Sequence, residues 1–279
     1  MVIATPSTSS EISRTPQRAR ERSVDIIIIL YEQGIEEITS LEYFLDSPTV
    51  HGVYIRDNSS HPHEVSATLH NRDLIHYRWM GGNVGLRKAY NNAIAECDAP
   101  FICIMDDDTA VPDDYLEKAA AYFIDEPAVY LPLVRTQREL ISPHLQFGYR
   151  VQAITDGDFS DSAHMSGINS GMILARDVFS TVHYNESLFL DEVDHQLMVQ
   201  IHEHGIPIIV MDDIVLHQSF SYDSNNMQAD IHRFRIWKQD TPTYYAMFRK
   251  GGKRAARRRI FARRRNLIRK YKSLHFLFI

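Results

Sequence analysis

The sequence has few cysteines and no long hydrophobic run. Its 279 residues include only two cysteines, Cys97 and Cys103. Two are too few for a disulfide scaffold, and they favour a reducing, cytoplasmic setting. The apolar runs, such as Ile26 to Leu30, are far shorter than the roughly 20 residues that a membrane-spanning helix requires. The first residues lack the apolar stretch of a signal peptide. We therefore expect a cytoplasmic globular protein.

Acidic side chains are absent from the C-terminal end of the sequence. From Ala246 to Ile279 there are 13 Lys or Arg and no Asp or Glu, which leaves 17 basic against 36 acidic residues elsewhere. The net charge of −6 therefore combines an acidic body with a basic tail. Composition predicts a disordered Ser/Thr/Pro-rich arm at 1–22, a main domain at 23–245 and a basic amphipathic helical tail at 246–279.

Apolar runs alternate with helical patterns from Val24 onward. The runs are rich in β-branched residues and lack polar alternation, which is typical of strands buried on both faces of a sheet. We expect strands at 24–30, 52–56, 100–105, 128–134, 171–175 and 206–210, and helices at 34–45, 85–96, 112–124 and 190–204. This order predicts an α/β fold with a doubly wound, mainly parallel, Rossmann-like sheet. Ligands of such sheets bind beyond the carboxyl ends of the strands.

Three consecutive aspartates, Asp106, Asp107 and Asp108, follow the predicted strand that ends at Met105. Adjacent carboxylates repel one another, so the end of a buried strand would need a counter-charge to hold them. Mg²⁺ or Mn²⁺, which prefer oxygen ligands, would supply it. In an extended chain, Asp106 and Asp108 project to the same side. The alternative is that the aspartates cap the helix that follows.

The aspartate triplet resembles the Asp-x-Asp segment of family-two glycosyltransferases with the GT-A fold. Further segments match the motifs of that family in the expected order between residues 24 and 249. They are Ile26–Tyr31, Tyr54–Ser60, Gly82–Gly85 with Asn91, Asn169–Leu174, Leu188–Asp194, Leu216-His217 and Tyr244-Tyr245 with Arg249. The later motifs are most similar to the bacterial rhamnosyltransferase branch, which builds surface polysaccharides.

The resemblance implies a metal-dependent, inverting glycosyltransferase that uses a UDP- or dTDP-sugar donor and a saccharide or lipid-linked saccharide acceptor. It implies that Mn²⁺ or Mg²⁺ binds to Asp106, Asp108 and His217. Residues that would contact the donor are Tyr31, Asp57, Asn83, Arg87, Asp106, Asp107 and Arg249. Candidates for the general base are Asp191, Glu192 and Asp194, of which we favour Asp191. Each of these roles has an alternative. Asp57 could simply form a turn, and His217 could be an ordinary, partly buried histidine. The acids at 191–194 could stabilise the start of a helix.

Two other functions compete with glycosyl transfer. A sugar nucleotidyltransferase would place a Gly-rich basic loop after the first strand, where this chain has Tyr31-Glu32-Gln33-Gly34. A non-enzymatic polyanion-binding protein would use the basic tail. For that tail we expect peripheral attachment to the anionic inner face of the cell membrane, and we expect no nucleic-acid partner. The alternative is a contact with the acidic body or with another subunit in a homo-oligomer.

Overall fold

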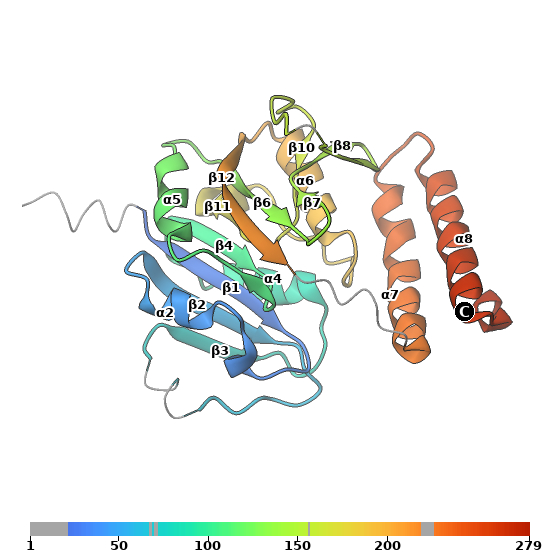
Figure 1. Cartoon of the computed structure of the whole chain (residues 1–279), viewed down its shortest axis with the longest axis horizontal. Coiled ribbons are helices and arrows are strands. Elements are labelled where there is room, and N and C mark those ends of the chain that lie inside the picture. The colour runs from blue at the N-terminus through green and yellow to red at the C-terminus, as the bar shows by residue number, and fades with distance from the viewer. Residues whose placement is uncertain (1–21, 67–68, 70–71, 156, 219–225) are drawn as a thin grey trace, which may run out of the picture.

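The structure is a computed structural model that describes the chain except for residues 1–21, 67–68, 70–71, 156 and 219–225. A central sheet has helices on both faces, and two long C-terminal helices stand beside it as a hairpin (Figure 1). The described helices include none that is both long enough and apolar enough to cross a membrane.

The main sheet is mixed, with four parallel strands at one edge, an antiparallel strand at its centre and one further parallel pair toward the other edge. Its order is β3-β2-β1-β4-β11-β6-β12-β5, and β7 pairs with β6. The pairs among β1, β2, β3 and β4 and the pair β6–β12 are parallel, whereas β11 and β5 run antiparallel to their neighbours. The strands are β1 Val24–Leu30, β2 Val50–Asp57, β3 Ile75–Trp79, β4 Phe101–Met105, β5 Thr109–Ala110, β6 Val129–Arg135, β7 Leu140–Ser142, β11 Met172–Ala175 and β12 Ile208–Gln218. A small antiparallel sheet contains β8 His144–Phe147, β9 Arg150–Ala153 and β10 Met165–Ser166.

Strand β1 is apolar along most of its length because both faces of the sheet are covered. Ile26 and Ile28 pack into one core cluster with α2 (Leu41–Asp46) and α5 (Tyr115–Tyr122). Ile27 and Ile29 pack into a second cluster with α4 (Leu86–Ile94) and α6 (Val193–Glu203). Since successive strand residues point to opposite faces, a run without polar alternation is what a two-sided core requires.

The carboxyl ends of the parallel strands lie at one edge of the sheet. Leu30 of β1 pairs with Asp57 of β2, and Asp57 pairs with Trp79 of β3. Ile28 pairs with Met105 of β4, directly before the three aspartates. The polar segments that follow β1, β2 and β4 therefore share this edge, where doubly wound sheets bind ligands.

The C-terminal helices α7 (Met227–Ala246) and α8 (Gly252–Tyr271) pack against one another. Gly251 takes a left-handed conformation at φ 80°, and a Cβ at Gly252 would collide with the Tyr245 carbonyl, so the two glycines allow the close turn between the helices. The buried contacts between α7, α8 and the 3-10 helix η3 (Leu274–Leu277) form a third cluster, around Ile231, Phe234, Trp237 and Phe276.

The predicted α/β class with a mainly parallel sheet and a helical C-terminal region is confirmed, but several boundaries differ. The segment predicted as one helix at 34–45 is a 3-10 turn, η1 (Ile35–Glu37), followed by the short α2. Strand β3 and helix α7 were not predicted, and β12 extends to Gln218. The first helix of the basic region begins at Gly252 rather than at residue 246. The predicted arm at 1–22 lies, apart from Arg22, outside the described residues.

Candidate active site

A cleft of about 990 Å³ opens between the sheet and the helical hairpin. Its sheet side contains Asp106, the segment 168–170, Gln218 and the start of α6, and its other side is formed by α7 and α8. The charged residues that line it are Asp106, Asp191, Glu192, Asp194, Asp230, Arg233, Arg259, Arg263 and Lys270. The structure thus brings the first aspartate of the triplet together with all three candidate bases, although the two groups are more than 80 residues apart in sequence.

Asp106 is held at the cleft by two neutral donors. The Ser170 hydroxyl donates a short hydrogen bond to its Oδ2, and Gln218 Nε2 donates to the same oxygen at 2.9 Å. Burial raises the pKa of Asp106, as do the charges of Asp108 and Asp194, whereas the two hydrogen bonds oppose the rise. Burial and the charges of Asp106 and Asp108 raise the pKa of Asp107 to about 6. The triplet therefore carries mutual repulsion that a bound cation would offset.

The chemistry of the triplet fits a divalent metal, while the third predicted ligand is placed less favourably. Asp106 and Asp108 offer carboxylate oxygens, and Asp108 is exposed. His217 pairs with Ala110, two residues beyond Asp108, but its side chain is exposed. In the part of the chain that the structure describes, no three His, Cys, Asp or Glu side chains gather as a metal-binding group. The metal site at Asp106, Asp108 and His217 stays a prediction.

Asp191 has the most distinctive environment among the candidate bases. Its Oδ1 accepts a hydrogen bond from Arg233 of α7 at 2.8 Å, and its side chain is 12% exposed. Its Oδ2 is buried without a hydrogen-bond partner among the described residues. Burial raises the pKa of Asp191 to about 6; Asp240 and Glu192 add to the rise, whereas Arg233 and Arg263 oppose it. One oxygen of the Asp191 carboxylate is thus not committed to a hydrogen bond.

The other two candidate bases are engaged by their surroundings. Glu192 has a left-handed backbone at φ 64°, precedes the first residue of α6 and lies 3.4 Å from Arg259 Nη1. Burial raises the pKa of Glu192, although His195 and Arg259 oppose it. Asp194 lies in the first turn of α6 and accepts the His195 N–H at 2.8 Å. Asp191 and Glu192 are both paired with an arginine, but among the three acids only Asp191 has a buried oxygen without a hydrogen-bond partner among the described residues.

The loop that carries Asp191 is fastened to α7 by Asp240. This aspartate is fully buried, and its carboxylate accepts the N–H groups of Phe189, Leu190 and Asp191 at 2.7–2.9 Å. On the other side of the loop, the Phe189 carbonyl accepts the Leu86 N–H at 2.9 Å, where a Cβ at Gly85 would not fit. Sequence reasoning missed Asp240 because helix α7, which carries it, was not predicted.

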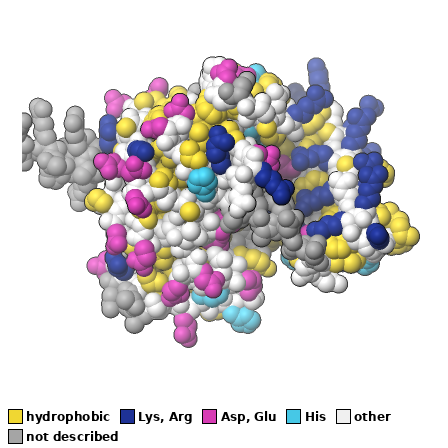
Figure 2. Space-filling model, in the orientation of Figure 1, with side chains coloured by type: hydrophobic (Ala, Val, Ile, Leu, Met, Phe, Trp, Pro, Cys, Tyr) yellow, Lys and Arg dark blue, Asp and Glu magenta, His cyan; other side chains and the backbone are white. Residues whose placement is uncertain are grey.

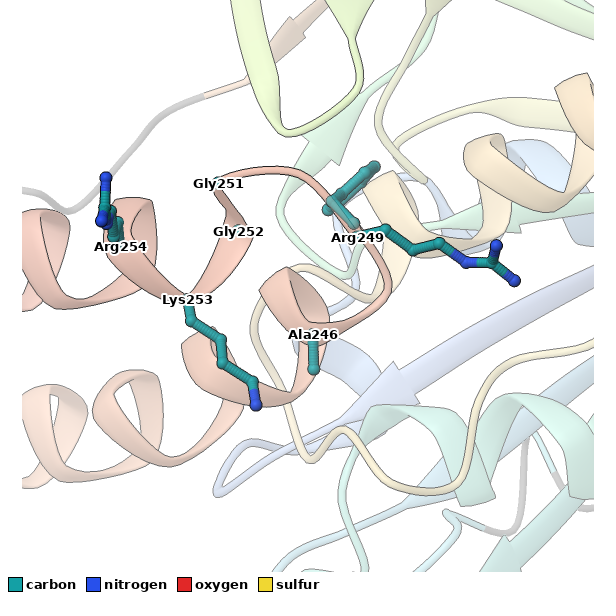
Figure 3. A pocket seen from close by; sticks show the side chains of 7 residues that line it. Ala246, Arg249, Gly251, Gly252, Lys253 and Arg254 are labelled. Atoms are coloured by element: carbon teal, nitrogen blue, oxygen red, sulfur yellow. The ribbon is translucent and has the colours of Figure 1, made fainter.

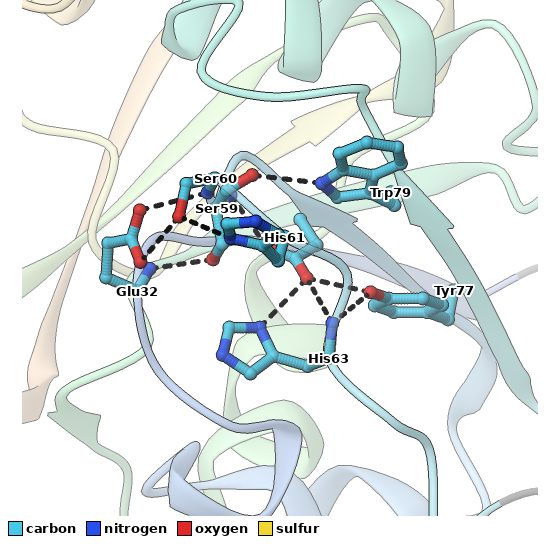
Figure 4. Close-up of polar contacts among 8 residues, drawn as sticks. Glu32, Ser59, Ser60, His61, His63, Tyr77 and Trp79 are labelled. Atoms are coloured by element: carbon cyan, nitrogen blue, oxygen red, sulfur yellow. Dashed lines mark hydrogen bonds and ion pairs between the residues drawn. The ribbon is translucent and has the colours of Figure 1, made fainter.

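Asp57, predicted to contact the nucleotide base, is buried in a turn network. Its oxygens accept the Ser59 N–H at 2.8 Å, the Tyr77 hydroxyl at 2.7 Å and the His63 N–H at 3.1 Å, and His63 Nδ1 lies 3.0 Å away. Burial would raise the pKa of Asp57, but hydrogen bonds from Ser59, Tyr77 and His63 outweigh it and lower the pKa. Figure 4 shows this network at the ends of β1, β2 and β3. The turn role alone accounts for these contacts.

The remaining predicted donor contacts lie outside the lining of the cleft. Tyr31 is 51% exposed after β1. Asn83 caps the Gly85 N–H at 3.1 Å, and Arg87 has a buried Nε without a partner among the described residues. Arg249 lines a separate cavity of about 390 Å³ at the turn between α7 and α8 (Figure 3). The donor roles of Tyr31, Asp57, Asn83, Arg87, Asp107 and Arg249 stay predictions.

One contribution to the cleft was not predicted, and another matches the alternative given for the basic tail rather than the preferred prediction. The first is Gln218, which is buried and reaches Asp106, whereas the predicted His217 is its exposed neighbour on β12. Side chains alternate along a strand, so a shift of one residue selects the opposite face. The second is the basic region, whose Arg259, Arg263 and Lys270 line the cleft. Part of this region therefore folds onto the acidic body.

The comparisons with known proteins agree with this geometry. A family model described as glycosyl transferase family 2 matches residues 35–183, more than half of the chain. A search of curated proteins finds no match. Among solved structures, S. aureus TarS is similar with a TM-score of 0.51 and 17% identity, over 82% of this chain and 44% of that one, so the chain spans less than half of its length.

Two further structures have the same fold. A shorter form, TarS 1-349, gives a TM-score of 0.52 at 15% identity, over 90% of this chain and 91% of that one. The mannosyltransferase PcManGT from Pyrobaculum calidifontis, in complex with GDP-Man and Mn²⁺, gives a TM-score of 0.53 at 14% identity. The match covers 80% of this chain and 63% of that one. TarS 1-349 has also been solved with UDP and with UDP-GlcNAc. The chain belongs to glycosyl transferase family 2 and has the GT-A fold.

Proposed function

We propose that this chain is a metal-dependent, inverting glycosyltransferase that moves a sugar from a UDP- or dTDP-sugar to a hydroxyl of a saccharide acceptor. We place it in the assembly of bacterial surface polysaccharide, with a rhamnosyltransferase-like donor. The observation that carries the proposal is the cleft, in which Asp191 keeps a buried carboxylate oxygen without a partner among the described residues and Asp106 lies on the same lining. Family membership favours this function over a sugar nucleotidyltransferase or a polyanion-binding protein.

The residues of the cleft suggest how transfer would proceed. The Asp191 carboxylate would take the proton of the acceptor hydroxyl, and the acceptor oxygen would attack the anomeric carbon of the donor. The bond from that carbon to the diphosphate oxygen breaks as the new bond forms, which inverts the anomeric centre. Asp106 and Asp108 would hold a divalent cation, which would neutralise charge on the leaving diphosphate. Ser170 and Gln218 orient Asp106 through its Oδ2.

A panel of nucleotide sugars, scored by thermal unfolding, tests the donor and the metal together. We expect a UDP- or dTDP-sugar to raise the melting temperature when Mn²⁺ or Mg²⁺ is present, because a ligand at about 100 times its Kd stabilises the native state by about 2.7 kcal/mol. Asp108→Asn should lose the metal-dependent part of the shift. Asp113→Asn, an acid-to-amide change at another exposed position, is the matched control and should retain it. An equal shift in EDTA would refute metal dependence.

The pH dependence of kcat/KM tests the environment of the proposed base. Asp191 must be ionised to accept a proton, and its pKa is raised to about 6, so kcat/KM should fall as the pH drops through about 6. The groups that set this value are Arg233 on α7, Arg263 on α8, Asp240 on α7 and Glu192. Arg233→Gln should move the acidic limb to higher pH because it removes a cation that stabilises the carboxylate. A profile that is flat from pH 5 to 7 would contradict the assignment.

A further inference from the structure

The basic helix α8 presents two different faces. The face turned toward α7 and the cleft carries Arg259, Arg263, Leu267 and Lys270. On the opposite side, Arg254, Arg257, Arg258 and Arg265 lie within about 60° of Phe261 around the helix axis, at 100° per residue. All five are exposed, and Phe261 is 65% exposed. We call these five residues the outer face of α8.

The end of the chain extends the outer face with apolar side chains. Leu274 and Leu277 of η3 are 66% and 49% exposed, and Phe278, which directly follows η3, is 86% exposed. This segment is fixed in place, because Phe276 is buried and Arg264 donates to the Ile279 carbonyl at 2.7 Å. Arg264 lies about 60° from Phe261 around the helix axis, and its guanidinium is 5.9 Å from the Phe234 ring of α7, so the apolar end lies at the border of the outer face. In Figure 2, dark blue side chains gather over the hairpin, with yellow groups at its free end.

We propose that the outer face of α8 and the exposed apolar residues Leu274, Leu277 and Phe278 dock on an anionic lipid bilayer. Residues 246–279 contain no Asp or Glu, so no acidic side chain of this region would repel the anionic headgroups that the outer face attracts. Phe261, Leu274 and Phe278 supply the apolar groups that an interfacial helix buries below the headgroups. The exposed arginines and the exposed apolar side chains lie on adjoining surfaces, and both kinds of side chain favour a bilayer as the partner.

Other partners fit these observations less well. A symmetric contact between two copies would bring the arginines of two outer faces together, and their like charges would repel. Nucleic acid would attract the arginines and could stack on Phe261 and Phe278, but Leu274 and Leu277 offer it neither stacking nor hydrogen bonds. A bilayer uses both kinds of side chain.

Docking by the outer face would bring the cleft close to the membrane, because the opposite face of α8, its inner face with Arg259, Arg263 and Lys270, lines the cleft. An acceptor whose saccharide is carried on a lipid would then reach Asp191 without leaving the bilayer. This last step rests on the proposed function, whereas bilayer binding does not, and the two can fail separately.

Co-sedimentation of the full chain with vesicles tests the proposal without any turnover. We expect binding to phosphatidylcholine vesicles in which about a third of the lipid is phosphatidylglycerol, and little binding to phosphatidylcholine alone. The triple variant Arg254→Gln/Arg257→Gln/Arg258→Gln should bind about 100-fold more weakly at low salt, because each surface cation contributes about a factor of five. Phe261→Ser/Phe278→Ser should bind at low salt and dissociate at a lower salt concentration than the wild type.

The matched control is Arg72→Gln/Arg138→Gln/Arg176→Gln, which removes three exposed arginines from the body. It should bind vesicles like the wild type. Equal losses in the two triple variants would overturn the proposal, since net charge alone would then explain binding. Failure of the wild type to bind anionic vesicles at low salt would also overturn it. So would binding to a labelled single-stranded RNA under conditions where vesicles are not bound.

Discussion

Replacing Asp191 with asparagine is expected to lower kcat by about 10²- to 10⁴-fold, the usual contribution of a general base, while donor affinity changes less than about twofold. The amide cannot accept the acceptor proton, although it has the size of the carboxylate. Because burial already disfavours the ionised form, the neutral amide should be accommodated with little loss of stability. Turnover and calorimetric donor binding measure the two parts of the expectation.

Glu192→Gln and Asp194→Asn are the matched controls for this experiment. Glu192 is paired with Arg259, and Asp194 binds the His195 N–H at the helix start, so each substitution removes a local contact rather than the proposed proton acceptor. We expect losses of kcat below about tenfold. If Glu192→Gln instead abolishes turnover and Asp191→Asn does not, Glu192 is the base and the assignment made here is wrong.

The sheet could be predicted from sequence because its physical cause is local. The run Ile26–Leu30 and the segment before Asp106 are apolar without alternation, and a two-sided core leaves few other structures for such runs. Strand β3 was missed because it lies at the edge of the sheet, where only parts of Ile75 and Tyr77 are buried. The pattern of an edge strand is too weak to distinguish from a loop.

The extent of β12 could not be read from apolar patterning. Asp212 and Asp213 interrupt its apolar run, and the pairing with β6 shifts register between Met211 and Val215. Such an irregularity accommodates the acids at the surface and lets the strand continue to Gln218. The same irregularity hides which side chains face the cleft, so motif matching favoured His217 while the structure places Gln218 against Asp106.

The site was predictable only in part because it is assembled from distant segments. The acids at 106–108 and 191–194 could be proposed from their positions after a strand and at a helix start. The cations on the other side of the cleft, such as Arg259 and Arg263, could not be proposed individually from sequence. Only the packing of α8 on α7 decides which of its many arginines face the cleft. The contact of Asp240 with the loop at 189–191 likewise depends on the course of α7 past the body.

Replacing Asp240 with asparagine is expected to lower the free energy of unfolding by about 2–4 kcal/mol and kcat by about 10²-fold. Its carboxylate accepts three consecutive N–H groups, including that of Asp191. An amide has a single acceptor oxygen, and its NH₂ group would face an N–H donor. The loop should therefore loosen, and Asp191 should lose its position. Chemical denaturation and steady-state kinetics measure the two effects.

The pH profile separates this positioning role from a purely structural one. The charge of Asp240 helps to raise the pKa of Asp191, so the neutral amide should move the acidic limb of kcat/KM to lower pH. The control is Thr241→Val, which removes a buried hydroxyl that donates to the Trp237 carbonyl at 2.7 Å within α7. It should cost about 1 kcal/mol of stability and leave the profile in place. If Asp240→Asn lowers the melting temperature but keeps kcat and the profile of the wild type, Asp240 supports the fold and does not position the base.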